Sequence, residues 1–533
     1  MTDARTRRIT QAAALMAAAA VTSRLLGIVR EAVVAALFGA GDAKGAYVIA
    51  YYVPFFVQRL LLGGTLSIVF IPTITRYLKS GDERASREVL SNLTGLVLAI
   101  GIGMVLLGQV IAPWIVPIAA PGFPAHLIAL ATSLTRILFV AMLFLALSVF
   151  LTAYLQSCEQ FAVPAFAPLL FNLAIIGGAL LLGPRLGIHG LAVAWVAGTA
   201  LQAAVQLPAA RRAGLRHRPT LDLRHPAVRE VARLALPAML GLAVVEINAY
   251  VDRFFASFLR LSGTVNAVAA LDYAYEVVQA PVGFFAISIA TAIFPILSQD
   301  AAEGDLEGLR RTTSLGLRVA IFTTLPVLAL YLAVPDLLVR VLFERFAFTP
   351  EATRAVAGAV AAYGAGLVSI ASYYVVTRTY YALHDMATPV RVGALMIPTN
   401  AVLDWLLMQV WGHVGIALAT SIVTTLNVGI LLWLLRRRLG TIQGRRIGQA
   451  AARAALAASG VGLVAWAASW APIQTLGAGI GARLAMALLA AGVAYLGASA
   501  LLRSEELHLV LDLVRRRPPK GARFDRSGTP VLR

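Results

Sequence analysis

The chain has 533 residues, of which 59% are hydrophobic and only 13% are charged, and its mean hydropathy is +0.80. A soluble domain carries about 25% charged residues, so this composition excludes an ordinary soluble fold. The formal net charge of +19 would favour a nucleic-acid partner in a soluble protein. Here the arginines lie mostly in short links between apolar runs, which is typical of membrane proteins and indicates no nucleic acid. Cys158 is the single cysteine, which excludes an internal disulfide and a multi-cysteine metal site.

Apolar runs long enough to cross a bilayer recur from end to end and predict an all-α polytopic membrane protein with about fourteen transmembrane helices. The first run, after Arg5, Arg7 and Arg8, resembles a signal peptide, but Arg24 and Arg30 follow at once. We therefore interpret it as the first membrane helix. The predicted helices cover residues 10–38, 46–78, 89–117, 129–157, 162–183, 189–209, 232–260, 268–298, 315–334, 356–383, 389–411, 415–435, 449–471 and 478–502.

The distribution of arginine predicts the orientation of the chain. Arginines concentrate in the links 211–231 and 436–446 and in the tail 504–533, whereas the link around Pro121 has no charge. The positive-inside rule then places these basic links and both termini in the cytoplasm. Residues 336–354 carry mixed charge and are expected to include a short surface helix.

A weak internal repeat divides the chain. The matching motifs are Phe70-Ile71-Pro72 with Ile293-Phe294-Pro295, Gly81-Asp82 with Gly304-Asp305, and Gly190-Leu191-Ala192 with Gly415-Ile416-Ala417. The first two matches are 223 residues apart and the third is 225 apart. They predict two six-helix bundles in parallel orientation around a central cavity, which is a transporter plan. The predicted domains are the bundles 1–210 and 232–436, the cytoplasmic linker 211–231, two additional helices in 437–503 and the tail 504–533.

Arginines inside the first bundle are the strongest candidates for a binding site. Burying a charge near the centre of a membrane helix costs at least about 2.5–3.5 kcal/mol, so such residues tend to face a cavity. Arg24 and Arg30 lie on the first predicted helix and Arg59 on the second. Their planar guanidinium groups suit a phosphate or diphosphate, and Gly27 would permit the bend that brings Arg24 and Arg30 to one face. In the alternative, Arg30 pairs with Glu31 or extends to an interface.

Acidic residues mark the start of the second bundle. Glu246, Asp252 and Glu276 would give it an acidic lining, and Glu246 or Glu276 would then pair with basic residues as a gate. The alternative is a structural ion pair, for example with Arg253.

A second polar group lies further along the chain. Asn400 and Asp404 are four residues apart, hence on one helix face, and Thr420 lies at similar depth on the next helix. Their oxygen atoms would suit an alkali cation or a proton relay, and the alternative is an interhelical hydrogen bond. The sequence contains no P-loop and no GxSxG motif, so nothing in it indicates an enzyme.

Several motifs together resemble the MurJ/MviN family, which belongs to the multidrug/oligosaccharidyl-lipid/polysaccharide exporter superfamily. The resemblance covers nearly the whole chain in register. The motifs that carry it are Ser23-Arg24-Leu25-Leu26-Gly27, Arg30-Glu31, Phe38-Gly39-Ala40-Gly41, Ala112-Pro113-Trp114, Ala120-Pro121-Gly122-Phe123, Pro164-Ala165-Phe166-Ala167-Pro168, Asn172, Tyr381-Ala382-Leu383, Asp385 and Thr388-Pro389.

The resemblance implies a lipid II flippase, which moves the undecaprenyl-diphosphate-linked peptidoglycan precursor from the cytoplasmic to the outer leaflet by alternating access. Arg24 and Arg30 fall on the family's essential cavity arginines, and Glu31 falls on its neighbouring acid. A sodium site of some members is similar to Asn400, Asp404 and Thr420, with Asp252 as a partner from helix seven. Sodium or proton coupling is therefore expected, without any other cofactor.

The chain also departs from the family pattern. Gly45 and Gly63 replace acids of the family, and Gln58-Arg59 replaces a basic pair. The family's Asp/Asn-Arg pair of helix eight reads Tyr275-Glu276, so an acid replaces a cavity arginine. Either another cation such as Arg253 or Arg378 compensates, or the substrate has changed.

Alternative functions therefore remain open at this point. The first is an exporter of another polyprenyl-diphosphate-linked glycan or a cation-coupled drug exporter of the same superfamily. The second is a scaffold of the cell-wall machinery, and the third is a membrane glycosyltransferase. The expected partners are the lipid-linked precursor, membrane lipids and cell-wall synthesis proteins.

Overall fold

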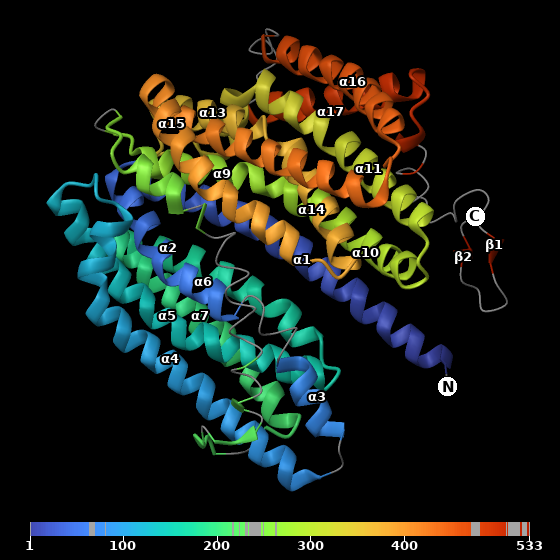
Figure 1. The fold of residues 1–533 in the computed structure, drawn as a ribbon. Coiled ribbons are helices and arrows are strands. Elements are labelled where there is room, and N and C mark those ends of the chain that lie inside the picture. The colour runs from blue at the N-terminus through green and yellow to red at the C-terminus, as the bar shows by residue number, and fades with distance from the viewer. Residues whose placement is uncertain are drawn as a thin grey trace. The chain divides into compact units, whose positions relative to one another are not determined.

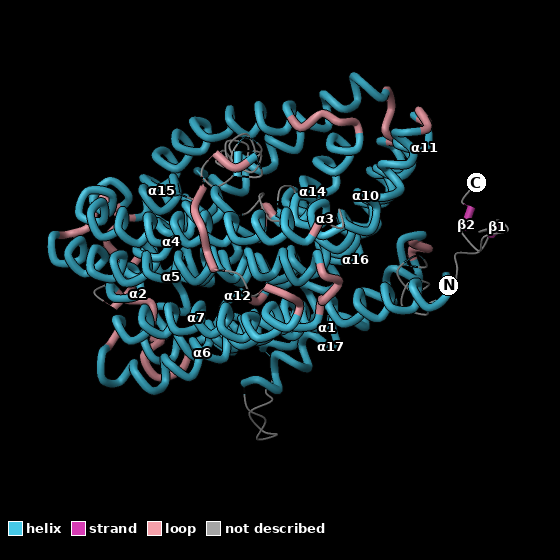
Figure 2. Tube along the Cα trace, turned by 90° about the horizontal axis from the view of Figure 1, so that it is seen from below, coloured by secondary structure: helices cyan, strands magenta, loops and turns pink. Residues whose placement is uncertain are grey.

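The computed structural model describes residues 2–62, 70–79, 82–215, 218–222, 224–226, 228–229, 233, 247–248, 250–261, 264–470, 480–507, 509, 523–524 and 530–531. Helices joined by short loops make up nearly all of this part (Figure 2). The chain divides into two compact units. Unit 1 comprises Met1–Tyr273, Leu342–Ala355 and Ile397–Ile416, and unit 2 comprises Ala274–Val341, Val356–Met396 and Ala417–Arg533.

Unit 1 is built from long helices that pack side by side. Its helices are α1 (Thr2–Phe38), α2 (Asp42–Leu62), α3 (Ile71–Lys79), α4 (Glu83–Ala119), α5 (Ala125–Ser157), α6 (Ala162–Leu186), α7 (Ile188–Arg212) and the start of α9 (Ala267–Pro281). Within this unit α5 contacts α2, α4 and α7, while α6 contacts α1 and α7 (Figure 1). Helices that are distant in the sequence, such as α1 with α6 and α2 with α5, therefore pack against each other.

Unit 2 contains the remaining helices. They are the π-helical turn η2 (Val282–Ala286), α10 (Ile287–Ala302), α11 (Leu306–Ala333), α12 (Pro335–Phe343), α13 (Pro350–Gly364), α14 (Leu367–Ala382), α15 (Ala387–Leu439), α16 (Gly444–Trp470) and α17 (Ile480–Leu501), some of which extend into unit 1. The two-residue strands β1 (Arg523–Phe524) and β2 (Pro530–Val531) pair in antiparallel fashion. The short helix α12 confirms the one expected within 336–354.

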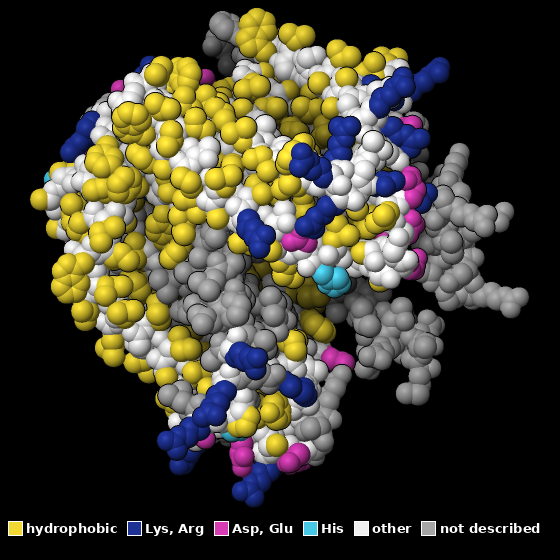
Figure 3. Space-filling model, viewed as in Figure 1, with side chains coloured by type: hydrophobic (Ala, Val, Ile, Leu, Met, Phe, Trp, Pro, Cys, Tyr) yellow, Lys and Arg dark blue, Asp and Glu magenta, His cyan; other side chains and the backbone are white. Residues whose placement is uncertain are grey.

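The described helices are those of a multi-pass membrane protein. Nine of them are long and apolar enough to cross a membrane, or ten if α13 and α14, which meet at 43°, form one span. Large apolar side chains such as Trp114 and Leu181 are exposed, and apolar side chains cover much of the visible surface (Figure 3). Exposed apolar surface of this extent is expected where lipid is the solvent. The predicted all-α polytopic class is confirmed, and the number of about fourteen spans stays a prediction.

Two repeated aspartates begin helices in the two units. Asp82 accepts hydrogen bonds from the backbone N–H groups of Arg84 and Ala85 at 2.9 and 3.0 Å, and it caps α4. Asp305 accepts one from Gly308 N at 2.8 Å and caps α11. An N-cap carboxylate satisfies backbone donors that a helix leaves unpaired. The repeated Gly-Asp motif therefore has a local structural role at both positions.

Two repeated glycines turn the chain between helices. Gly187 separates α6 from α7 with φ 56°, ψ −140°, and Gly412 interrupts α15 with φ 56°, ψ −134°. A positive φ of this kind is readily adopted only by glycine. Gly412 makes α15 two helices, as the predicted break between 411 and 415 required. Nearby, a Cβ on Gly190 or Gly415 would lie 2.7 or 2.2 Å from the carbonyl oxygen of Leu182 or Leu407.

Glycine also permits the close approach of α4 and α5. A Cβ on Gly108 would lie 2.0 Å from Cγ of the buried Phe139, whereas one on Gly103 would meet nothing within 4 Å. We therefore expect Gly108→Ala to lower the free energy of unfolding by about 1–3 kcal/mol, the usual cost of overpacking. Gly103→Ala, on an exposed position of the same helix, should leave it nearly unchanged. Thermal unfolding of the detergent-purified variants measures both, and equal midpoints would contradict the expectation.

Asp385 joins the two ends of α15 from the loop that precedes it. Its Oδ1 accepts a hydrogen bond from Thr388 N at 2.9 Å, and its Oδ2 accepts one from Thr388 Oγ1 at 2.6 Å. Arg438, near the C-terminal end of α15, forms an ion pair with the same carboxylate. Burial by itself raises the pKa of Asp385, but the Thr388 hydrogen bonds and the Arg438 charge outweigh it and hold the pKa below its usual value.

A pH-dependent stability follows from this lowered pKa. A carboxyl whose pKa is lower in the folded than in the unfolded chain stabilises the fold above its unfolded pKa of about 3.9. That contribution is lost as the pH falls through the folded pKa. Asp385→Asn should therefore lower the midpoint of thermal unfolding at pH 7, and the difference from the unsubstituted chain should shrink toward pH 3. A difference independent of pH would contradict the assignment.

Candidate functional site

Arg30 lies near the end of α1, and its guanidinium group is fixed by three hydrogen bonds. Nε and Nη2 donate to Glu31 Oε1 at 3.1 and 2.8 Å, and Nη1 donates to Asn172 Oδ1 on α6 at 3.1 Å. Asn172 in turn donates to Ser23 Oγ at 3.3 Å. The guanidinium carbon lies 5.7 Å from the centre of the Trp195 ring. Arg30 is thus oriented in advance while its side chain remains 15% exposed.

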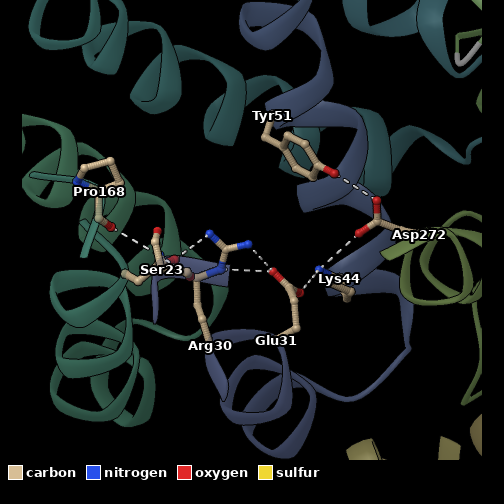
Figure 4. A network of polar contacts seen from close by, with 8 residues as sticks. Ser23, Arg30, Glu31, Lys44, Tyr51, Pro168 and Asp272 are labelled. Atoms are coloured by element: carbon tan, nitrogen blue, oxygen red, sulfur yellow. Dashed lines mark hydrogen bonds and ion pairs between the residues drawn. The ribbon is translucent and has the colours of Figure 1, made fainter. Parts of the chain in front are cut away.

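A lysine and an aspartate continue this chain of charges (Figure 4). Lys44, in the first turn of α2, has its Nζ 3.6 Å from Glu31 Oε2 and 3.3 Å from Asp272 Oδ2. Asp272 belongs to α9, and its Oδ1 accepts a hydrogen bond from the Tyr51 hydroxyl at 2.8 Å. Lys44 and Asp272 are both buried. The network therefore joins α1, α2 and α9 within unit 1.

Arg253 extends the network by one further cation. Its Nη2 lies 3.9 Å from Asp272 Oδ1, and its guanidinium carbon lies 4.0 Å from the centre of the Tyr52 ring. We call Arg30, Glu31, Lys44, Asp272 and Arg253 the charge network. Cations and anions alternate along it, and its three cations exceed its two anions by one charge. A partly desolvated site with excess positive charge favours an anion.

The starts of α2 and α9 are fixed against each other beside this network. Asn266 Nδ2 donates to Asp42 Oδ1 at 2.8 Å, and Asn266 N donates to the Ala40 carbonyl at 2.8 Å. A Cβ on Gly45 would lie only 2.4 Å from Asn266 Cγ. The acid that the family pattern places at Gly45 would therefore require the side chain of Asn266 to move.

The other predicted cavity residues are placed as follows. Arg24 is exposed, and α1 is helical through Gly27. The helix continues through the position where Gly27 would permit a bend, and six helical residues turn about 600°, which leaves Arg24 and Arg30 about 240° apart around α1. Arg59 lies on α2, but its side chain is outside the described part of the structure, as is the whole of Glu246.

Asp252, Asn400 and Asp404 form a second polar cluster in unit 1, and all three are buried. Asn400 Nδ2 donates to Asp252 Oδ1 at 2.8 Å and to Asp404 Oδ2 at 2.9 Å. In the described structure Asp404 Oδ1 is buried without a hydrogen-bond partner. Two buried carboxylates that share Asn400, one of them with an oxygen that accepts no hydrogen bond in the described structure, fit a hard monovalent cation or a shared proton.

Two predicted site residues belong to unit 2. Thr420 lies half-buried on the second half of α15, and Glu276 lies exposed on α9, so their predicted roles as a cation ligand and a gate stay predictions. Arg378, considered as a compensating cation, lies on α14, where its guanidinium carbon is 5.2 Å from the centre of the Phe294 ring. Arg253, the other compensating cation considered, is the one that lies in the charge network.

Comparison with known proteins places the chain in a family. The family model described as lipid II flippase MurJ matches residues 34–480. The chain belongs to the lipid II flippase MurJ family. It is 32% identical over 436 residues to a probable lipid II flippase MurJ of Vibrio cholerae, covering 80% of this chain and 82% of that protein. It is 30% identical over 434 residues to the lipid II flippase MurJ of Burkholderia cenocepacia, covering 79% and 82%.

Solved structures agree on the fold. A lipid II flippase MurJ in an inward closed conformation superposes with a TM-score of 0.77 at 24% identity, over 94% of this chain and all of that one. An inward-facing multidrug resistance transporter of the MATE family has a TM-score of 0.66 at 14% identity, over 79% and 96% of the two chains. The MurJ fold predicted from the motifs is therefore confirmed.

Lys44 and Asp272 are the residues of the charge network that our sequence analysis missed. Each is a charged residue near the start of an apolar helix, and each follows a glycine-containing link. Their neighbours Gly45 and Glu276 drew attention instead because they departed from the family pattern. A search for single charged residues at the starts of apolar segments would have identified both Lys44 and Asp272.

Proposed function

We propose that this chain moves lipid II, the undecaprenyl-diphosphate-linked peptidoglycan precursor, from the cytoplasmic to the outer leaflet of the bacterial inner membrane by alternating access. Membership of the MurJ family supports the substrate, and the relatives it matches carry this activity in their names. The proposed activity is transport without covalent change to the substrate. The basic links and tail support a cytoplasmic location for both termini.

The oriented guanidinium group of Arg30 is the observation that carries this proposal. Two nitrogen atoms of one planar fork face the same direction, and this geometry matches two oxygen atoms of a diphosphate. Glu31 pairs with that fork in the structure, and we propose that a headgroup diphosphate takes its place there. Arg24 and Arg59 are proposed as further headgroup contacts. The polyprenyl tail would remain in lipid while the headgroup is carried.

The cluster of Asp252, Asn400 and Asp404 is proposed as the site of the coupling ion. Oδ1 of Asp404 accepts no hydrogen bond in the described structure, and this supports a sodium ion or a proton there, because a buried carboxylate oxygen without a partner is costly. Thr420 is proposed as a further ligand. Ion binding would bias the exchange between the two states of the carrier.

Complementation tests the proposed substrate most simply. A bacterial strain depleted of its own lipid II flippase should grow when this chain is expressed, and labelled lipid II should become accessible from outside. The control is the same chain with Arg30→Ala at matched membrane abundance. Growth failure by the unsubstituted chain, when it is present in the membrane at normal levels, would count against lipid II as the substrate.

A further inference from the structure

Lys44 is a buried cation between two carboxylates, and the proposed transport mechanism does not yet use it. Its side chain is 2% exposed, and its Nζ lies 3.3 Å from Asp272 Oδ2 and 3.6 Å from Glu31 Oε2. The Nζ also lies 4.6 Å from the centre of the Tyr273 ring. A lysine is seldom buried to this degree unless it is paired. Because Lys44 lies next to the proposed substrate site, we expect it to have a function there.

The two oxygen atoms of Glu31 have different partners. Oε1 accepts both hydrogen bonds from Arg30, at 3.1 and 2.8 Å. Oε2 is buried and accepts no hydrogen bond in the described structure, but it faces Lys44 Nζ at 3.6 Å. Figure 4 shows Glu31 between Arg30 and Lys44. A small movement of Glu31 toward Lys44 would close this ion pair into a hydrogen bond.

Arg30 and Lys44 differ in their access to a ligand. Arg30 retains 15% of its side-chain exposure, whereas Lys44 retains only 2%. An incoming anion can therefore reach the guanidinium group but not the ammonium group. Arg30 can therefore bind the headgroup directly, whereas Lys44 can act only through its neighbour Glu31.

We propose that Lys44 is a positioning residue that receives Glu31 when a lipid-linked diphosphate displaces it from Arg30. This inference rests on the proposed function and specifies how the site exchanges anions. Without Lys44, the displaced Glu31 would become a buried carboxylate without a cation, which is strongly unfavourable. Lys44 lowers that cost, so it strengthens diphosphate binding at Arg30 without contacting the ligand. The paired Asp272 keeps Lys44 in place while Glu31 moves.

A double-mutant cycle on ligand affinity tests this role. The dissociation constant of undecaprenyl diphosphate is measured on the detergent-purified full chain and on the variants Lys44→Met, Glu31→Gln and Lys44→Met/Glu31→Gln. We expect Lys44→Met alone to weaken binding by about 10-fold. In the Glu31→Gln background, where no carboxylate needs to be received, Lys44→Met should change the affinity by less than about 2-fold.

Controls separate this role from a structural one. The double variant removes one charge of each sign and so keeps the balance of the charge network, and thermal unfolding of each variant reports folding. Lys44→Arg should bind within about 3-fold of the unsubstituted chain because it retains the cation. Equal weakening by Lys44→Met in both backgrounds, or no weakening in either, would overturn the proposal. If the unsubstituted chain does not bind the diphosphate, the proposed function fails first, and this inference fails with it.

Discussion

Arg30→Ala is expected to abolish rescue of a flippase-depleted strain and to weaken binding of a lipid-linked diphosphate by about 10- to 100-fold. This range corresponds to the loss of charge-assisted hydrogen bonds worth about 1.5–3 kcal/mol. The structure supplies the reason, since Arg30 is the oriented and partly exposed cation of the charge network. Growth at matched membrane abundance and ligand titration of the purified variant measure the two effects.

Two control substitutions test whether the effect of Arg30→Ala depends on the guanidinium group and on this particular arginine. Arg30→Lys keeps the positive charge but loses the planar fork, so it should give partial rescue. Arg84→Ala removes an arginine whose side chain is 90% exposed. Among the described residues, its ion pair is with Glu88, four residues further along the same helix. A surface pair of this kind contributes little, so Arg84→Ala should rescue fully. Full rescue by Arg30→Ala as well would remove the assignment of the anion site.

Asp404→Asn is expected to produce the second large loss, in ion coupling rather than in headgroup binding. The substitution preserves the shape of the side chain but removes one of two buried carboxylates, and with it the charge that would hold a cation. For the unsubstituted chain, sodium in place of potassium should raise the midpoint of thermal unfolding by a few degrees, because ligand binding stabilises the folded state. In Asp404→Asn this rise should disappear, and rescue should fall at least about 10-fold.

The diphosphate affinity of Asp404→Asn distinguishes coupling from general damage. It should stay within about 3-fold of the unsubstituted chain, because Asp404 lies in a different cluster from Arg30. A sodium effect that persists in Asp404→Asn would contradict the cation site. If sodium has no effect on the unsubstituted chain while Asp404→Asn still fails to rescue, a proton is the ion to test.

The helices could be predicted from sequence because their signals are local. Uninterrupted apolar runs predicted the spans, and the break between 411 and 415 anticipated the turn at Gly412. The family motifs predicted the MurJ fold. Whether Gly27 bends the first helix could not be predicted, because glycine permits a distortion without requiring one, and α1 stays helical there.

The charge network could be predicted only in part because its contacts connect distant parts of the chain. Arg30 and Glu31 are adjacent in sequence, and their pairing was one of the alternatives considered. Asn172 lies 142 residues from Arg30, and Asp272 lies 228 residues from Lys44. No local pattern specifies which charged residues of separate helices meet. The cluster of Asp252 with Asn400, 148 residues away, was expected only from the family resemblance.

Direct transport by the purified chain is the measurement that tests the central claim. The chain is reconstituted into liposomes that contain labelled lipid II, and the appearance of label in the opposite leaflet is followed over time. We predict transfer by the unsubstituted chain that is at least about 10-fold faster than in liposomes with Arg30→Ala. Equal transfer rates for the two chains, with both folded and inserted, would contradict a headgroup site built around Arg30.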